Sequence, residues 1–312
     1  MITTVTLNPA LDKIIKLPIL DIGQLNRADK AIERAGGKGI NVARIVHKLG
    51  REVQAISLLG GYTGKHLENI LREEKIPINI SWINEKTREN IKIVEEDGRE
   101  TEINQKGSIS IEDYSNFLKI FKKELKRSKI LVLAGSLPQG LSPDAYSQLI
   151  SLAKKENVKT ILDTSGQALE LGIKSQPYLI KPNIEELRVL MNKELKQISD
   201  IIIAANDLID QGINTVVISL GEKGALYIQK DEYYHTLPPK LEIFESTVGA
   251  GDSMVGALSI AINEEFSFQE MSKFATNVAS LFISGKTINQ NNLNKMKDNI
   301  KLIDGVELDE IV

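Results

Sequence analysis

The chain has 312 residues, of which 42% are hydrophobic and 26% are charged, as in an ordinary globular protein. Its formal net charge of -3 gives no basic footprint for nucleic acid, and the lack of cysteine excludes a disulfide framework and cysteine-bound zinc. The N-terminus lacks the pattern of a signal peptide, and no apolar run approaches the roughly 20 residues that a membrane helix needs. We therefore expect a cytoplasmic protein with no nucleic-acid or membrane partner.

Short apolar segments alternate with amphipathic helical patterns along most of the chain. Strands are predicted at Thr3–Leu7, Val53–Leu59, Ile130–Leu133, Thr160–Leu162 and Thr215–Ser219. Helices are predicted at Gly39–Leu49, Gly64–Glu74, Ile111–Arg127, Pro143–Lys155, Ile184–Met191 and Ser199–Gln211, and a hairpin over Ala225–Ile228 and Tyr233–His235 precedes two long helices. Continuously apolar strands are typical of parallel sheets covered on both faces. The order predicts a single α/β domain over residues 1–312, with a doubly wound, mostly parallel sheet.

Two stretches, 12–34 and 80–104, depart from this alternation. They alternate apolar and polar residues, contain turn signals and lack a helical period. In the second stretch Ile91, Ile93 and the Asp97-Gly98 turn indicate a hairpin. Because both stretches follow core strands, we expect a small antiparallel β-sheet set apart from the main body, where it can act as a lid. An ordinary surface hairpin would give the same pattern.

The most informative segment is Thr247-Val-Gly-Ala-Gly-Asp-Ser253. Its two glycines leave backbone N–H groups unobstructed, and the apolar and small residues from Asp252 to Asn263 predict a buried helix. A helix N-terminus with bare amides attracts anions, phosphate above all. Asp252 is then placed to take a proton from a hydroxyl that attacks phosphorus. A plain helix N-cap after a tight turn is the alternative.

A second glycine cluster, Ala35-Gly-Gly-Lys-Gly-Ile-Asn41, joins the first lid-like stretch to a helix. Its glycines allow a ligand to approach the backbone, Lys38 adds a positive charge, and Asn41 offers a donor and an acceptor. The spacing is not that of a P-loop, and a flexible hinge would explain the same residues. Upstream, Asp12 follows the first strand, where a carboxylate suits sugar hydroxyls; an Asx turn is the alternative.

Three further turns follow core strands. The first turn is Gly135-Ser-Leu-Pro-Gln-Gly140, and the second is Ser219-Leu-Gly-Glu-Lys-Gly224. The second turn either borders a nucleotide or starts a hairpin. In the third, Lys181-Pro-Asn-Ile-Glu-Glu186, the residues Asn183 and Glu186 share a helix face. This spacing suits a hydrated Mg²⁺ ion, and it equally suits a capping box.

One arginine lies in each lid-like stretch, Arg27 in the first and Arg88 in the second. The arginine fork matches phosphate oxygens in pairs. Two arginines on a lid would therefore hold a phosphate that the substrate already carries. Solvated strand arginines are the alternative.

Together these motifs resemble the ribokinase-like sugar kinases, in their phosphofructokinase-B branch, in matching order over nearly the full chain. Segment Ala35–Asn41 resembles the family's first signature, Ser246–Ser253 its second, and Asn183-x-x-Glu186 its metal-associated motif. Segment Thr6–Asp12, the Lys38 variant of the glycine loop and Leu162-Asp-Thr-Ser-Gly166 look most like the 1-phosphofructokinase and tagatose-6-phosphate kinase group. The chain departs from the family near its C-terminal helices, where Ser284-Gly-Lys-Thr-Ile288 lacks the usual Gly-Thr dipeptide.

The resemblance implies a role for each candidate residue. The catalytic set would be Asp252 as the base, the amides of Gly249, Ala250 and Gly251 as an anion hole, and Lys38. The sugar phosphate would be bound by Asp12, Arg27, Gly36, Gly37, Asn41, Arg88 and Ser136. The ATP site would be lined by Lys181, Asn183, Ser219, Gly221, Gly224, Asn277 and Ser280, with Mg²⁺ held through water by Glu186 and Asn183.

The resemblance also implies the reaction, with ATP and Mg²⁺ as cofactors. It is the ATP-dependent phosphorylation of a ketohexose phosphate, fructose 1-phosphate to fructose 1,6-bisphosphate. Tagatose 6-phosphate and fructose 6-phosphate are alternative substrates, and a non-catalytic sensor of nucleotide or sugar phosphate is an alternative of another class. Apolar lid residues such as Ile14, Ile91 and Ile93 favour a homodimer formed through the lid.

Overall fold

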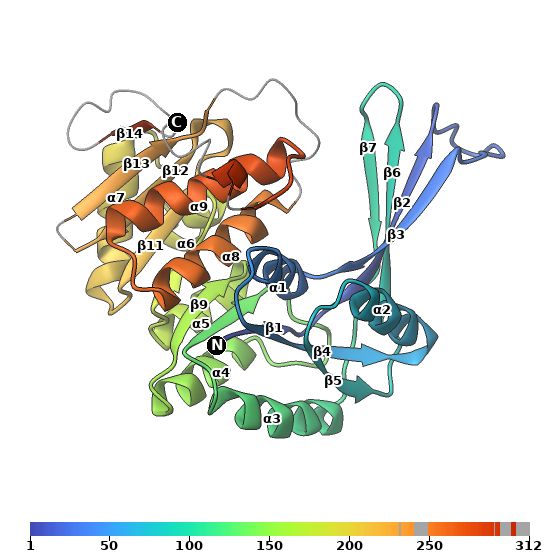
Figure 1. The fold of residues 1–312 in the computed structure, drawn as a ribbon, viewed down its shortest axis with the longest axis horizontal. Helices are drawn as coiled ribbons and strands as arrows, with labels where there is room; N and C mark the ends of the chain where they lie inside the picture. The colour runs from blue at the N-terminus through green and yellow to red at the C-terminus, as the bar shows by residue number, and fades with distance from the viewer. Residues whose placement is uncertain (231, 240–248, 290, 294–300, 304–312) are drawn as a thin grey trace.

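The computed structural model describes residues 1–230, 232–239, 249–289, 291–293 and 301–303. Within these residues one large sheet forms the main body (Figure 1). Its strands are β1 (Ile2–Thr6), β4 (Val53–Gly60), β5 (Ile78–Ile83), β8 (Ile130–Ala134), β9 (Lys159–Asp163), β10 (Leu179–Ile180), β11 (Thr215–Ser219), β12 (Ala225–Gln229), β13 (Glu232–Leu237) and β14 (Lys301–Ile303). They lie in the order β14-β13-β12-β11-β10-β9-β8-β1-β4-β5, parallel from β11 to β5 and antiparallel at the other edge. The predicted doubly wound, mostly parallel sheet is confirmed.

Helices cover both faces of this sheet. One face carries α1 (Lys38–Lys48), α2 (Gly61–Glu73), α8 (Ala250–Asn263) and α9 (Phe268–Ile283). The other carries α3 (Ile111–Leu125), α4 (Ala145–Lys155), α5 (Gly166–Lys174), α6 (Ile184–Met191) and α7 (Ile198–Asp210). Alternate strand residues point to opposite layers, so Val132 packs in one apolar core while Leu131 and Leu133 pack in the other. No helix in the described part of the chain is long and apolar enough to cross a membrane.

The predicted elements are found close to their expected bounds. Strand β11 and helix α6 begin and end where the sequence predicts, and most other ends differ by one to three residues. Helix α5 was not predicted, because its residues carry no clear helical signal. Its nine residues include two glycines and bury only Leu169, Gly172 and Ile173, which is too weak an apolar face to be recognised.

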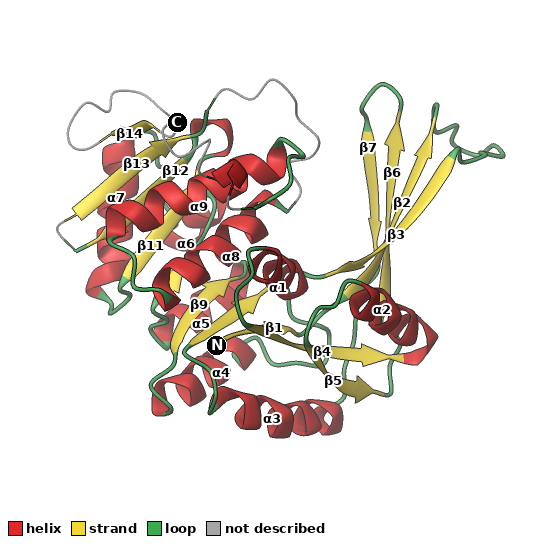
Figure 2. Cartoon of the chain, in the orientation of Figure 1, coloured by secondary structure: helices red, strands yellow, loops and turns green. Residues whose placement is uncertain are grey.

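A separate four-stranded sheet stands apart from the main body (Figure 2). This lid sheet has the order β3-β2-β6-β7, from β2 (Ala10–Leu17), β3 (Lys30–Gly36), β6 (Arg88–Glu95) and β7 (Glu100–Asn104). The β6–β7 hairpin appears where it was predicted, with Gly98 at a φ of 86° in its turn. Two expectations were wrong. The central pair β2–β6 is parallel rather than antiparallel, and strand β5, which overlaps stretch 80–104, pairs with β4 in the main sheet.

The exposed apolar residues of the lid sheet are not the predicted ones. Ile93 is buried at 9% exposure because β6 is a central strand, and Ile14 and Ile91 are half-buried. The exposed residues are Ile103 on β7 and three in the loop between β2 and β3, namely Ile19, Ile22 and Leu25. The apolar surface of the lid therefore lies mainly on its outer loop.

Helix α1 begins against the end of β1, and Gly39 allows this approach. A Cβ atom at Gly39 would lie 2.5 Å from the carbonyl oxygen of Val5 and 2.5 Å from Thr6 Oγ1. These distances are shorter than side-chain carbon atoms tolerate, so the start of α1 is fixed close to the sheet.

Replacing Gly39 by alanine tests this contact. Alanine is the better helix former by about 1 kcal/mol, so an unobstructed site would gain stability. We expect instead a loss of about 1 to 3 kcal/mol, because α1 must move away from β1. Urea unfolding of the two proteins gives the sign, and a Gly39→Ala protein more stable than the parent would contradict the packing argument.

Candidate active site

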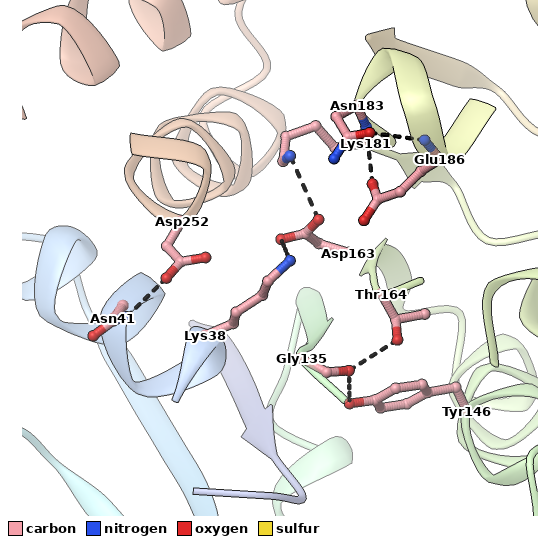
Figure 3. A network of polar contacts seen from close by, with 10 residues as sticks. All are labelled: Lys38, Asn41, Gly135, Tyr146, Asp163, Thr164, Lys181, Asn183, Glu186 and Asp252. Carbon is pink, nitrogen blue, oxygen red and sulfur yellow. Dashed lines mark hydrogen bonds and ion pairs between the residues drawn. The ribbon is translucent and has the colours of Figure 1, made fainter. Parts of the chain in front are cut away.

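The candidate site lies where five parallel strands of the main sheet end at the same edge. Asn8 follows β1, Ser136 follows β8, Asp163 closes β9, Lys181 follows β10 and Ser219 closes β11. Ligands of doubly wound sheets bind at this edge. The N-termini of α1 and α8 complete the site, bringing Lys38 and Asp252 to the same group of side chains (Figure 3).

Asp252 lies in the first turn of α8 and is 7% exposed. The N-cap is Gly249, with a φ of 96°, so the alternative that Asp252 is a plain N-cap is wrong. Asp252 Oδ2 instead accepts a hydrogen bond of 2.7 Å from Asn41 Nδ2 on α1. The carboxyl is therefore held from another helix, and it is free of a capping role in its own.

The first turn of α8 also presents backbone amides to the site. The N–H groups of Ala250 and Gly251 precede the first intrahelical bond, which Ser253 makes to the Gly249 carbonyl. A Cβ at Gly251 would lie 3.4 Å from Lys181 Nζ. Bare amides and an ammonium group thus adjoin each other beside Asp252, an arrangement that favours an anion.

Asp163 is the charge centre of the site, and its side chain is 1% exposed. Its two oxygens face two lysines: Oδ2 lies 3.3 Å from Lys38 Nζ, and Oδ1 lies 3.5 Å from Lys181 Nζ (Figure 3). Burial by itself would raise the pKa of Asp163, but the two ammonium groups outweigh burial and hold the pKa below its usual value. Asp163 is consequently charged and fixes both lysines at the sheet edge.

The same charges act on Asp252. Burial, assisted by the negative charge of Asp163, raises the pKa of Asp252 from 3.8 to about 6. The bond from Asn41 and the charges of Lys38 and Lys181 oppose this shift and limit it. A carboxylate with a pKa near neutrality is suited to accept a proton at physiological pH.

Asn183 and Glu186 form the capping box of α6. Asn183 Oδ1 accepts from the Glu186 amide at 2.8 Å, and Glu186 Oε2 accepts from the Asn183 amide at 2.9 Å. The capping-box alternative is therefore correct, and it leaves Glu186 Oε1 for another partner. The negative charge of Glu186 also helps to raise the pKa of Lys38, although burial, the largest influence, acts the other way and Asp163 contributes more. Within the described ranges no group of three His, Cys, Asp or Glu side chains could hold a metal ion alone.

On the lid side, Asp12 lies in β2 directly over the bare Cα of Gly36. A Cβ at Gly36 would lie 2.0 Å from Asp12 Oδ2, so a larger residue here would displace the Asp12 carboxyl group. Asp12 Oδ1 accepts a hydrogen bond of 2.9 Å from Asn90 Nδ2 on β6. Burial raises the pKa of Asp12, and Asn90 and the charge of Arg88 reduce the shift.

The two predicted phosphate-binding arginines differ in their surroundings. Arg88, at the start of β6, donates to the carbonyl oxygens of Asn8 and Gln105 and stands beside the site, where Asn8 Nδ2 donates to Ser136 Oγ at 3.0 Å. Arg27 lies in the exposed loop between β2 and β3. In the described part of the chain no hydrogen bond or ion pair connects Arg27 to the site.

The predicted ATP-lining residues fall into two groups. Asn277 and Ser280 on α9 are buried, and they donate to the carbonyl oxygens of Leu293 and Thr276, while Asn277 Oδ1 has no hydrogen-bond partner among the described residues. Gly221 and Gly224 lie in the turn after β11, with φ values of 63° and 84°. Residues 246–248 of the second signature lie outside the described residues.

Sequence reasoning missed two residues of the site. Asp163 was noticed only within a family motif, although a carboxylate that directly closes a buried strand is the signal that pointed to Asp12. Asn90 had no local signal, because its position opposite Asp12 depends on the parallel register of β2 and β6.

Comparisons with known proteins identify the family of the chain. Residues 5–294 match the family described as pfkB family carbohydrate kinase. The chain is 36% identical over 271 residues to 1-phosphofructokinase of Bacillus subtilis (strain 168), covering 86% of the chain and 88% of that protein. It is 38% identical over 293 residues to the ATP-dependent 6-phosphofructokinase isozyme 2 of Escherichia coli (strain K12), covering 93% of each. The crystal structure of phosphofructokinase-2 from Escherichia coli in complex with fructose-6-phosphate matches with a TM-score of 0.88 and 32% identity, covering 95% of this chain and 98% of that one. The chain therefore belongs to the pfkB family of carbohydrate kinases.

Proposed function

We propose that this kinase transfers the γ-phosphoryl group of ATP to the free primary hydroxyl of fructose 1-phosphate, giving fructose 1,6-bisphosphate. The observation that carries the proposal is Asp252: a buried carboxyl with a pKa raised to about 6, at a helix N-terminus beside bare amides and two lysines. This is the arrangement that phosphoryl transfer to an alcohol requires, a proton acceptor next to a site for the migrating phosphoryl group.

In this proposal each group has one task. Asp252 accepts the proton of the attacking hydroxyl, and Asn41 keeps its carboxylate directed at that hydroxyl. The amides of Gly249, Ala250 and Gly251 and the Lys38 and Lys181 ammonium groups share the charge of the transferred phosphoryl group. Because Asp163 holds both lysines in place beforehand, little reorganisation is needed when the nucleotide binds.

Magnesium is part of the proposal. Mg²⁺ keeps most of its water and is commonly held by one or two carboxylates together with substrate phosphates. Glu186 fits this role through its second oxygen, and Asn183 stands beside it at the start of α6. When bound there, the ion would neutralise charge on the nucleotide phosphates.

On the sugar side, Asp12 and Asn41 would hold hydroxyls, with Gly36 and Gly37 allowing close approach. Arg88 and Ser136 would bind the phosphate that the substrate already carries, assisted by Arg27 if the outer loop folds inward. Closure of the lid sheet over the sugar would exclude water and limit wasteful hydrolysis of ATP. The turn at Ser219, Gly221 and Gly224 would border the nucleotide.

Fructose 1-phosphate is favoured by the motifs that resemble the 1-phosphofructokinase and tagatose-6-phosphate kinase group, and by the relative from Bacillus subtilis. Fructose 6-phosphate is the second candidate, since a structurally similar protein was crystallised with that sugar. Tagatose 6-phosphate is the third. A non-catalytic sensor has little support, because the carboxylate and both lysines of the site are present.

Replacing Asp252 by asparagine tests the proton acceptor. Asparagine keeps an oxygen for the bond from Asn41 but accepts no proton, so we expect kcat to fall by about 10² to 10⁴ while substrate KM changes little. Asp113→Asn is the matched control, a buried carboxyl in the first turn of α3, and it should retain turnover. A near-normal kcat in the Asp252→Asn protein would contradict the proposal that Asp252 is the proton acceptor.

The pH dependence gives a second, independent prediction. Since Asp252 must be ionised to accept a proton, kcat/KM should rise with pH and level off above about pH 6. The same carboxyl binds its proton more tightly in the folded protein than in the unfolded chain, where its pKa is near 3.8. The stability of the parent relative to Asp252→Asn should therefore fall by about 1 to 3 kcal/mol as pH rises from 4 to 7. A flat difference in urea unfolding would show that the pKa is unshifted.

A substrate panel decides the sugar. We expect kcat/KM to be highest for fructose 1-phosphate among the three ketohexose phosphates, measured by coupled release of ADP at one fixed ATP concentration. The Asp252→Asn protein controls for contaminating kinase. A tenfold preference for tagatose 6-phosphate or fructose 6-phosphate would reassign the substrate within the same family.

We also propose that the chain forms a homodimer through its lid. The outer loop exposes Ile22 at 92% and Leu25 at 76%, more apolar surface than a single hairpin normally leaves in water. Sedimentation at micromolar concentration should give a dimer, which Ile22→Lys should weaken. Ile203→Lys, at an exposed position on α7, should leave the dimer intact. A parent protein that sediments only as a monomer would contradict this proposal.

A further inference from the structure

Arg44 on α1 joins three elements around the catalytic base, and the sequence did not single it out. Its Nε lies 2.9 Å from Glu74 Oε2, at the end of α2. Its Nη2 donates to the carbonyl oxygen of Ala35 on β3 at 3.0 Å, and its Nη1 donates to Asn41 Oδ1 at 2.8 Å. The side chain is 19% exposed, so the guanidinium is largely withdrawn from water.

The bond to Asn41 determines which way its amide group faces. A guanidinium has only donors, so the atom that meets Arg44 must be the Asn41 oxygen. The NH₂ group is then directed to the other side, where Asn41 Nδ2 donates to Asp252 Oδ2 at 2.7 Å. With Arg44 in place, the hydrogen bond to Asp252 comes from a donor, which favours the ionised carboxylate.

We propose that Arg44 is a positioning residue that acts on the base through Asn41, fixing the orientation of this amide and thereby keeping Asp252 ionised and directed. The proposal rests on the proposed function of Asp252 but adds a residue outside the groups assigned to the sugar and the nucleotide, since Arg44 contacts Glu74, Asn41 and Ala35. Glu74 and the Ala35 carbonyl fix the guanidinium in turn, so one end of the lid sheet is tied to the orientation of the base.

Loss of Arg44 should act on Asp252 in a defined direction. Without the guanidinium, the Asn41 amide can turn over and present its oxygen, which only a protonated Asp252 can bond. The other groups that face Asp252, namely Asp163 on β9, Lys38 on α1 and Lys181 after β10, remain unchanged. The proton affinity of Asp252 should therefore rise by about one pH unit, the equivalent of one lost hydrogen bond to a charged group.

The test measures this affinity without turnover. Urea unfolding from pH 4 to 8 is compared for the parent and its Asp252→Asn variant, because the difference between them titrates with Asp252. The same pair is then made in an Arg44→Leu background. We expect the pH midpoint of this stability difference to rise by about one pH unit. We also expect kcat/KM for the sugar phosphate to fall first at acidic pH. An unmoved midpoint would overturn the proposal.

Arg51→Leu is the matched control. Arg51 also binds one carboxylate, Glu264, and one carbonyl oxygen, that of Leu49, but among the described residues it has no bond to the site. The Arg51→Leu substitution should lower stability without moving the pH midpoint. A shift of the midpoint equal to that of Arg44→Leu would show that the effect of Arg44 is merely structural. In an Asn41→Ala background, Arg44→Leu should add no further movement, and an undiminished effect would contradict action through Asn41.

If Arg44→Leu does not fold, Arg44→Lys takes its place, since it keeps the charge beside Glu74 but loses the fork that spans three acceptors. The pH readout also separates the two proposals. Absence of turnover with all three sugar phosphates, together with a shifted midpoint, would refute the proposed substrates and leave the role of Arg44 intact. Turnover with an unmoved midpoint would support the proposed function and refute the role of Arg44.

Discussion

The site depends on one electrostatic constraint: the carboxylate of Asp163 is buried at the edge of the main sheet and must be balanced there. Two ammonium groups, Lys38 from α1 and Lys181 from the turn after β10, provide the balance. An uncompensated charge at this depth would be strongly destabilising. Folding therefore draws both lysines to the edge where the strands end, and their positions are set before any ligand arrives.

Lys38 and Lys181 form ion pairs with Asp163 and leave a second carboxyl group, that of Asp252, without an ion-pair partner among the described residues. Asp252 has no lysine of its own within ion-pair distance in the described structure, and the charge of Asp163 acts on it as a repulsion. Two carboxyls of one site thus differ in proton affinity because their surroundings differ: one is paired and acidic, the other is buried and only weakly acidic. Under the proposed function, that difference would make Asp163 a structural anion and Asp252 the proton acceptor.

Much of this was predictable from the sequence, and the exceptions have physical reasons. The main sheet, helix α8 and the place of Asp252 were predicted because apolar periodicity and paired glycines are local signals. The partners of Asp252 were not, since the contact from Asn41 spans 211 residues and depends on how α1 packs against α8. The parallel pairing of β2 and β6 was not predicted for a related reason, because the two strands are separated by α1, β4, α2 and β5.

That separation has a consequence for how the molecule assembles. The central strands β2 and β6 of the four-stranded sheet are separated by roughly a quarter of the chain, and the intervening part includes β4 and β5 of the main sheet. Contacts between distant segments form slowly, since the intervening loop must close first. The four-stranded sheet should accordingly be among the last parts to form and among the first to open, so the main body can be folded while this sheet is still unpaired.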